Sequence, residues 1–85
     1  MASYRVDITR SVEKELESLA VKDHTRVVTR MRALADDPRP HGCEKLSGEE
    51  KYRIRQGDLR VIYAVEDQTL VVTVVKIGHR REVYR

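Results

Sequence analysis

The sequence is poor in cysteine and lacks long apolar runs. Cys43 is the only cysteine among 85 residues, which excludes an internal disulfide and a multi-cysteine zinc site. There is no run of about 18 or more apolar residues and no basic segment followed by an apolar one, so we expect neither a membrane span nor a signal peptide. These absences predict a cytoplasmic protein in a reducing compartment, with no membrane partner.

Several catalytic signatures are also missing. Acidic residues form no pair near the basic end of the chain, so metal-dependent phosphodiester cleavage has no evident carboxylate site. The phosphate-binding motif GxxxxGK[ST] does not occur. His24, His41 and His79 lie far apart in the sequence, and Cys43 has no base that can be assigned to it. We therefore expect no metal and no cofactor, and keep only His79, beside Arg80, as a supporting candidate.

Positive charge is concentrated in the C-terminal part of the chain. The net charge is +3. Residues 1–50 carry nine Lys/Arg and ten Asp/Glu, whereas residues 51–85 carry eight and four. This asymmetry predicts a surface that faces a polyanion. The alternative, equally compatible with the charge count, is a set of ordinary solvated arginines.

The N-terminal part predicts a strand and a first helix. Residues 4–8 alternate apolar and polar side chains, which is typical of a half-buried strand. Thr9 or Ser11 can cap the helix that follows. Its apolar residues fall on one stripe: Val12, Leu16, Leu19 and Ala20.

A second helix and a loop follow. Asp23 is the expected N-cap, and the helix should end at or soon after Asp36, because Pro38 cannot continue it. Residues 37–50 contain both prolines and two of the four glycines, so they are predicted to form a loop. The apolar stripe of the second helix contains Val27, Met31, Leu34 and Ala35.

After this loop the apolar period changes from about 3.6 residues to two. The alternation predicts strands at residues 52–55, 59–66 and 69–78, divided by turns at 57–58 and 67–68. Short turns make these three strands an antiparallel meander, with the helices packed on one face.

The expected architecture is therefore a single α+β domain over residues 1–85, with the element order β-α-α-β-β-β. The first turn sets Ile54 opposite Val61 and Arg55 opposite Arg60, and the second sets Val75 opposite Arg60. One face then collects the predicted sheet core: Tyr52, Ile54, Leu59, Val61, Tyr63, Val65, Leu70, Val72 and Val74.

Arg53, Arg55 and Arg60 gather at one end of the opposite face. Like charges directly opposite on a sheet are destabilising by up to about 1 kcal/mol. Guanidinium groups match phosphate oxygens in a planar, two-pronged way. The cluster therefore predicts an anionic ligand, and the alternative is that the three side chains splay into water.

The C-terminal stretch IGHRREVYR, residues 77–85, is expected to emerge at this arginine-rich end. It would bring Arg80, Arg81 and Tyr84 to the cluster. Several cations around one phenol would lower a pKa that is about 10 in isolation. Such a phenol could act as general base or acid for a ribose 2′-hydroxyl, while arginines stabilise charge developing on a phosphate.

Two stretches, YRIRQGDLRVIYAVED and VVKIGHRREVYR, resemble the RelE toxins of bacterial and archaeal toxin–antitoxin systems, within the RelE/ParE superfamily. The similarity covers nearly the whole chain. It implies a RelE-like microbial RNase fold and an mRNA interferase that enters the A site of the 30S subunit and cuts the bound mRNA without a metal. The 2′-hydroxyl would attack the neighbouring phosphate, leaving a cyclic phosphate and a 5′-hydroxyl.

The resemblance also implies residue roles. Arg60 would stabilise the transition state, and Arg80 would protonate the leaving group or contact the phosphate. Tyr84 would be the general base or a stacking platform. Contacts to mRNA or rRNA phosphates are expected from Arg53, Arg55 and Arg81. Relatives often carry lysine at the first two of these positions. This chain has arginine there, which does not readily give up a proton, so a proton-transfer role is not expected of Arg53 or Arg55. Arg81 could replace Arg80.

Partner and alternatives follow from the same resemblance. A co-encoded antitoxin, RelB-like or of another family, should neutralise the toxin in a hetero-oligomeric complex, and Ile62, Val71 and Val75 on the open sheet face could receive it. The second hypothesis is a ParE-like inhibitor of DNA gyrase without nuclease activity. The third is a nucleic-acid-binding module without catalysis, which the few available tyrosines disfavour.

Overall fold

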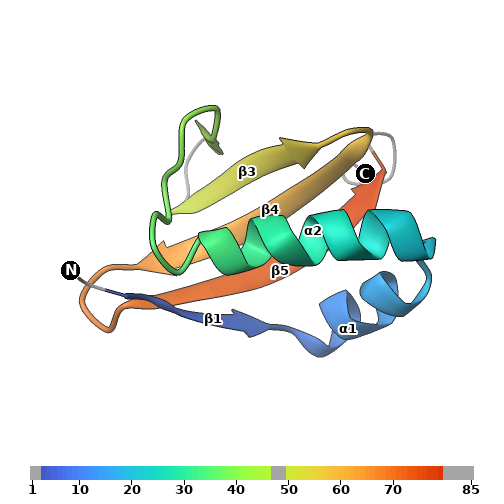
Figure 1. Ribbon diagram of the computed structural model, residues 1–85. Coiled ribbons are helices and arrows are strands. Elements are labelled where there is room, and N and C mark those ends of the chain that lie inside the picture. Colours follow the sequence, from blue (N-terminus) through green and yellow to red (C-terminus); the bar gives the residue numbers. More distant parts are fainter. Residues whose placement is uncertain (1–2, 47–49, 80–85) are drawn as a thin grey trace.

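The computed structural model describes residues 3–46 and 50–79 (Figure 1). They form two helices and one mixed five-stranded sheet of strand order β1-β5-β4-β3-β2. The elements are β1 Arg5–Ile8, α1 Arg10–Glu17, α2 Val21–Ala33, β2 Glu44–Lys45, β3 Lys51–Gln56, β4 Leu59–Glu66 and β5 Val71–His79. The predicted α+β class is confirmed. β1 lies parallel to β5, and the other strand pairs are antiparallel.

The first helix begins as the sequence predicts. Thr9 is the N-cap of α1, and its hydroxyl accepts a hydrogen bond from the Val12 amide at 3.3 Å. Val12 and Leu16 from this helix are buried, whereas Ala20 is exposed. In the described part of the chain, no helix combines the length and apolarity needed to cross a membrane.

The second helix differs from the prediction at both ends. Ala20 is the N-cap of α2, so the prediction of Asp23 is wrong; Asp23 lies in the first turn, where a carboxylate is favourable to the helix dipole. The helix ends at Ala33 rather than near Asp36. The Ala35 carbonyl accepts from the Tyr4 amide at 2.8 Å, so the chain leaves the helix to meet the residue before β1.

The loop predicted over residues 37–50 contains a short strand, so that prediction is wrong at Glu44–Lys45. β2 pairs with β3, with Glu44 opposite Arg53. The Leu46 amide donates to the Lys51 carbonyl at 2.8 Å next to this pairing. Two residues are too few for a period-two pattern to reveal a strand.

The β3–β4 hairpin has the predicted register. Ile54 is opposite Val61 and Arg55 is opposite Arg60. The turn uses Gly57 with φ of +61°, a conformation that glycine adopts without steric cost. This register determines where the arginines lie.

The β4–β5 pairing differs from the prediction. The connecting loop has four residues rather than two, and Leu70 adopts φ of +56° in it. A β-bulge beside Ile62 then adds one further residue. Gly78, not Val75, is therefore opposite Arg60. Valine and threonine recur on both faces of β5, so the apolar pattern alone did not select the register.

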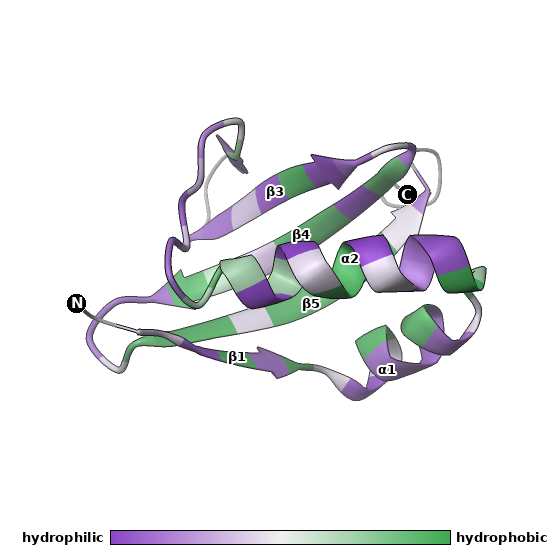
Figure 2. Cartoon of the chain, viewed as in Figure 1, coloured by the Kyte–Doolittle hydropathy of each residue, from purple (hydrophilic) through white to green (hydrophobic). Residues whose placement is uncertain are grey.

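The core lies between the helices and one face of the sheet. α2 runs across the sheet in the view of Figure 1, and green apolar stretches of β4 and β5 lie behind it in Figure 2. The predicted core face is buried except at Leu70, which is 37% exposed in the loop. Ile77 is buried instead, because the bulge turns this residue, rather than Lys76, toward the core.

Candidate functional site

Strand pairing brings three predicted arginines to one end of the sheet. Arg53 and Arg55 lie two residues apart on β3, and Arg60 lies near the start of β4, directly opposite Arg55. Gly78 is the cross-strand partner of Arg60 on the other side. The last described residues of β5 therefore lie beside the arginines, as the sequence predicted, although the register differs by three residues.

Arg60 is buried to a degree that the sequence did not predict. The residue is only 6% exposed. Its Nη1 donates to the carbonyl oxygens of Leu59 at 3.3 Å and Gly57 at 3.4 Å. The opposite residue, Gly78, has no side chain. A guanidinium held in a buried setting by carbonyl oxygens interacts more strongly with an approaching anion than one in bulk water.

Arg53 and Arg55 both contact Glu44. Arg53 forms a hydrogen-bonded ion pair with the Glu44 carboxylate, and the Arg53 side chain is only 12% exposed. Arg55 Nη2 lies 3.7 Å from the other carboxylate oxygen. The prediction that these arginines need an external anion was thus incomplete, because β2 supplies one. Sequence reasoning missed Glu44 because it lies in the segment assigned as a loop.

A fourth arginine approaches this end from α2. Arg30 Nη2 donates to the Arg55 carbonyl at 3.5 Å. The Arg30 Nε is buried and has no hydrogen-bond partner among the residues that the structure describes. The helix side therefore adds positive charge beside the β3–β4 turn.

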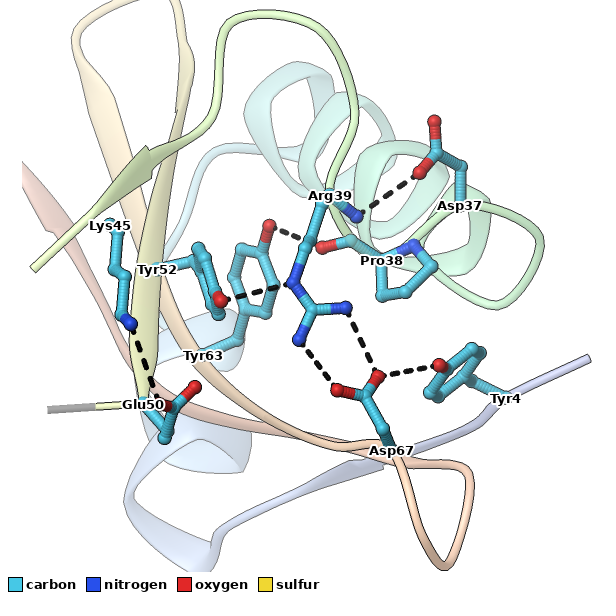
Figure 3. Close-up of polar contacts among 9 residues, drawn as sticks. All are labelled: Tyr4, Asp37, Pro38, Arg39, Lys45, Glu50, Tyr52, Tyr63 and Asp67. Atoms are coloured by element: carbon cyan, nitrogen blue, oxygen red, sulfur yellow. Dashed lines mark hydrogen bonds and ion pairs between the residues drawn. The ribbon is translucent and has the colours of Figure 1, made fainter.

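The opposite end of the sheet holds a different polar cluster, drawn in Figure 3. Arg39 makes a two-pronged ion pair with Asp67, with distances of 3.0 and 2.9 Å, and the Tyr4 hydroxyl donates to Asp67 Oδ1 at 2.7 Å. The hydrogen bonds from Arg39 and Tyr4 lower the pKa of Asp67. The bond to Asp67 raises the pKa of Tyr4 and, with the Tyr52 bond, that of Arg39.

Two more tyrosines complete this cluster. Tyr63 donates to the Pro38 carbonyl at 2.7 Å, and burial raises the pKa of its phenol. Tyr52 accepts from Arg39 Nε at 3.0 Å and stacks on Tyr63 with ring centroids 5.8 Å apart. These contacts hold the segment after α2 against the sheet. All three described tyrosines are therefore engaged in contacts within the fold (Figure 3). Tyr52 precedes Arg53 on β3, but its side chain is buried on the core face of the sheet, opposite the face that carries the arginines.

The remaining predicted site residues, Arg80, Arg81 and Tyr84, lie outside the described residues. Their roles stay predictions. Within residues 3–46 and 50–79, no three His, Cys, Asp or Glu side chains come together as metal ligands. His79 is exposed and opposite Leu59 at the end of β5.

Comparison with known proteins gives consistent results. The family model described as the ParE toxin of the type II toxin–antitoxin system parDE matches residues 6–84. Among solved structures, the archaeal RelE–RelB complex of Pyrococcus horikoshii has a chain 32% identical, with a TM-score of 0.80, covering 92% of this chain and 96% of that one. A search of curated protein sequences found no match.

Two bacterial structures are similar as well. The isolated Escherichia coli RelE toxin is 28% identical with a TM-score of 0.80, covering 96% of this chain and 92% of that one. The RelBE2 toxin–antitoxin complex of Mycobacterium tuberculosis has a chain 24% identical with a TM-score of 0.83, covering 94% of each, which supports the fold alone. The chain therefore belongs to the ParE toxin family of type II toxin–antitoxin systems, within the RelE/ParE superfamily that its motifs indicated.

Proposed function

We propose that this chain is a ribosome-dependent endoribonuclease that cuts mRNA in the ribosomal A site, acts in the cytoplasm and thereby inhibits translation. The observation that carries the proposal is the gathering of Arg53, Arg55 and Arg60 beside the end of β5. The next residues of the chain supply Arg80 and Tyr84. The similarity to RelE structures supports the same conclusion.

The proposed reaction needs no metal. The ribose 2′-oxygen forms a bond to the adjacent phosphorus, and the bond from phosphorus to the 5′-oxygen breaks. One group takes the 2′-hydroxyl proton and another gives a proton to the 5′-oxygen. Tyr84 is assigned the base role and Arg80 the acid or phosphate-contact role, with Arg81 as the alternative. Arg60 stabilises charge on the phosphate in the transition state.

Elimination among the tyrosines supports the role of Tyr84. The sequence has four tyrosines. Tyr4, Tyr52 and Tyr63 are all engaged in the cluster around Arg39. The three phenols in the described part of the chain are thus engaged within the fold, which supports assigning the proton-transfer role to Tyr84. Arg53, Arg55 and Arg81 are assigned to phosphates of mRNA or rRNA.

A co-encoded antitoxin is the proposed regulatory partner, in a hetero-oligomeric complex. Related RelE structures include complexes with RelB from Pyrococcus horikoshii and Methanococcus jannaschii. In this chain Ile62, Val71 and Val75 are only partly buried on the face of the sheet opposite the core. Co-purification of the chain with the product of the neighbouring gene tests this partner.

A second candidate function is inhibition of DNA gyrase. The family model that matches the chain is that of the ParE toxin, and this match favours gyrase inhibition as the alternative. The two functions differ in the chemistry they require, because a gyrase inhibitor needs no group that moves a proton. Tyr84→Phe should therefore abolish toxicity if the chain is a nuclease and leave toxicity unchanged if it inhibits gyrase.

Primer extension on a translated message after brief induction tests the nuclease. Wild-type chain should produce cuts within codons, and Tyr84→Phe and Arg60→Ala should lose them or reduce them strongly. Growth arrest with intact messages and altered plasmid supercoiling would favour the gyrase function instead. Expression without any effect on growth would contradict a toxin.

A further inference from the structure

We propose that Glu44 is an internal competitor for the arginines that bind phosphate, so that a strand of RNA must displace its carboxylate to engage Arg53 and Arg55. The inference rests on the proposed function in one respect, namely that the external ligand is RNA. Glu44 would then set how strongly the site binds isolated or non-cognate phosphates. It is a specificity-determining residue rather than a catalytic one.

The geometry of β2 places a carboxylate where a phosphate would bind. Glu44 is the cross-strand partner of Arg53, so both side chains point to the same face of the sheet. Arg55 lies two residues further along β3 and shares that face. One carboxylate oxygen contacts Arg53 and the other lies 3.7 Å from Arg55. A phosphodiester has two non-bridging oxygens that can bridge two guanidinium groups in the same manner.

The Glu44 carboxylate is open to a competing anion from the solvent side. The side chains of Glu44 and Arg55 are 54% and 58% exposed, so their ion pair is screened by water and contributes little to stability. Arg53, at 12% exposed, is the more firmly held of the two arginines. Displacement of Glu44 would therefore leave Arg53 in place and Arg55 able to turn toward a ligand.

β2 is also weakly attached. It has two residues, lies at the edge of the sheet and pairs with β3. Lys45 pairs with Glu50 at 3.4 Å between exposed side chains. Short edge elements with few buried contacts open more readily than the core of a sheet. Glu44 can thus move away without unfolding β3 or β4.

The competition favours a particular kind of ligand. A single phosphodiester carries the same charge as the Glu44 carboxylate, so it gains little by replacing it. An RNA strand that reaches Arg60 at the same time adds further phosphate contacts and displaces more counterions. The internal carboxylate therefore disfavours single phosphates and favours strands that occupy the whole arginine cluster.

Binding of a 2′-O-methylated RNA oligonucleotide tests the proposal, because this RNA cannot be cut by 2′-hydroxyl attack. Fluorescence anisotropy would compare wild type with Glu44→Gln, which removes the charge but keeps the shape. We expect Glu44→Gln to bind about three- to tenfold more tightly at low salt. The matched control is Glu50→Gln, which removes one charge from the same hairpin and should change the affinity less than about twofold.

The remaining variants separate the two levels of the proposal. The double variant Arg53→Ala/Arg55→Ala should weaken RNA binding if these arginines bind phosphate. If it does, but Glu44→Gln binds RNA no more tightly than Glu50→Gln, the competitor role of Glu44 is overturned and the phosphate site stands. If Arg53→Ala/Arg55→Ala binds RNA like wild type, both are overturned. Thermal unfolding of each variant excludes a general loss of fold. Glu44→Asp, which keeps the charge, should bind RNA more weakly than Glu44→Gln.

Discussion

The two ends of the sheet use arginine in different ways. Around Arg39, the guanidinium, the Asp67 carboxylate and the Tyr4 hydroxyl satisfy one another, and the cluster fastens the segment after α2 to the sheet. At the other end, Arg55 and Arg60 are directly opposed, and Glu44 from an edge strand contacts Arg53 and Arg55. Arg39 at the first end is a structural residue, whereas the arginines at the second end are the ones that we propose bind phosphate.

The largest difference between the two ends should be seen in catalysis. Arg60→Ala is expected to lower the rate of mRNA cleavage by about 100-fold or more, because it removes a preorganised cation from the developing charge. Arg32→Ala, on the exposed face of α2, is the matched control and should cleave at the wild-type rate. Single-turnover cleavage on programmed ribosomes measures both. Equal rates for Arg60→Ala and Arg32→Ala would remove Arg60 from the catalytic site.

The Arg39 end should instead respond in stability. Tyr63→Phe removes the hydroxyl that donates to the Pro38 carbonyl at 2.7 Å in a fully buried residue. We expect a loss of about 1–2 kcal/mol in the free energy of unfolding, from the lost hydrogen bond and an unpaired carbonyl. Urea unfolding followed by circular dichroism measures it. Cleavage per folded molecule should not change, and a loss of cleavage at unchanged stability would contradict the division between the ends.

Glu15 connects the core to the site end. Its carboxylate accepts from the Ile77 amide at 3.1 Å and pairs with Lys76 at 2.7 Å, just before Gly78 meets Arg60. Glu15→Ala leaves that amide without its partner and should cost about 1 kcal/mol. We expect it to slow cleavage several-fold, because the end of β5 leads to Arg80 and Tyr84. Glu15→Gln keeps an acceptor for the Ile77 amide, so it should restore most of the stability and most of the cleavage rate. If it does not, the ion pair with Lys76 is the contact that matters.

The smallest effect is the pH dependence of the Arg39 end. The pKa of Asp67 is lowered in the folded state, so its contribution to stability is present above the unfolded pKa, about 3.9, and is lost as pH falls through the lowered value. The pKa of Tyr4 is raised, so its contribution is present below about 10 and lost as pH rises through the raised value. Unfolding of Asp67→Asn and Tyr4→Phe across pH measures both limits. If a variant shows the same dependence of stability on pH as wild type, the contact that it removes does not contribute to that dependence.

The sequence was informative where turn chemistry and alternation agreed. Gly57 and the alternating apolar residues around it led to the correct β3–β4 register, and with it the positions of Arg55 and Arg60. The β4–β5 register was wrong because β5 is apolar on both faces and Asp67 is held in a longer loop.

The candidate site was predictable only in part for similar physical reasons. Glu44 lies on a strand of two residues, which has no periodicity to recognise. The burial of Arg60 depends on its neighbours across the sheet, including Gly78, and the sequence contains no direct signal of it. The roles of Arg80, Arg81 and Tyr84 are predictions from motif resemblance.

Analysis of the ends of cleaved mRNA is the most direct test of the central claim. Purified chain would be added to ribosomes programmed with a defined message, and the fragments would be examined for their terminal groups. We predict one cut in the A-site codon, with a 2′,3′-cyclic phosphate on the upstream fragment and a 5′-hydroxyl on the downstream one, absent with Tyr84→Phe. An intact message together with inhibited supercoiling by purified gyrase would contradict the account.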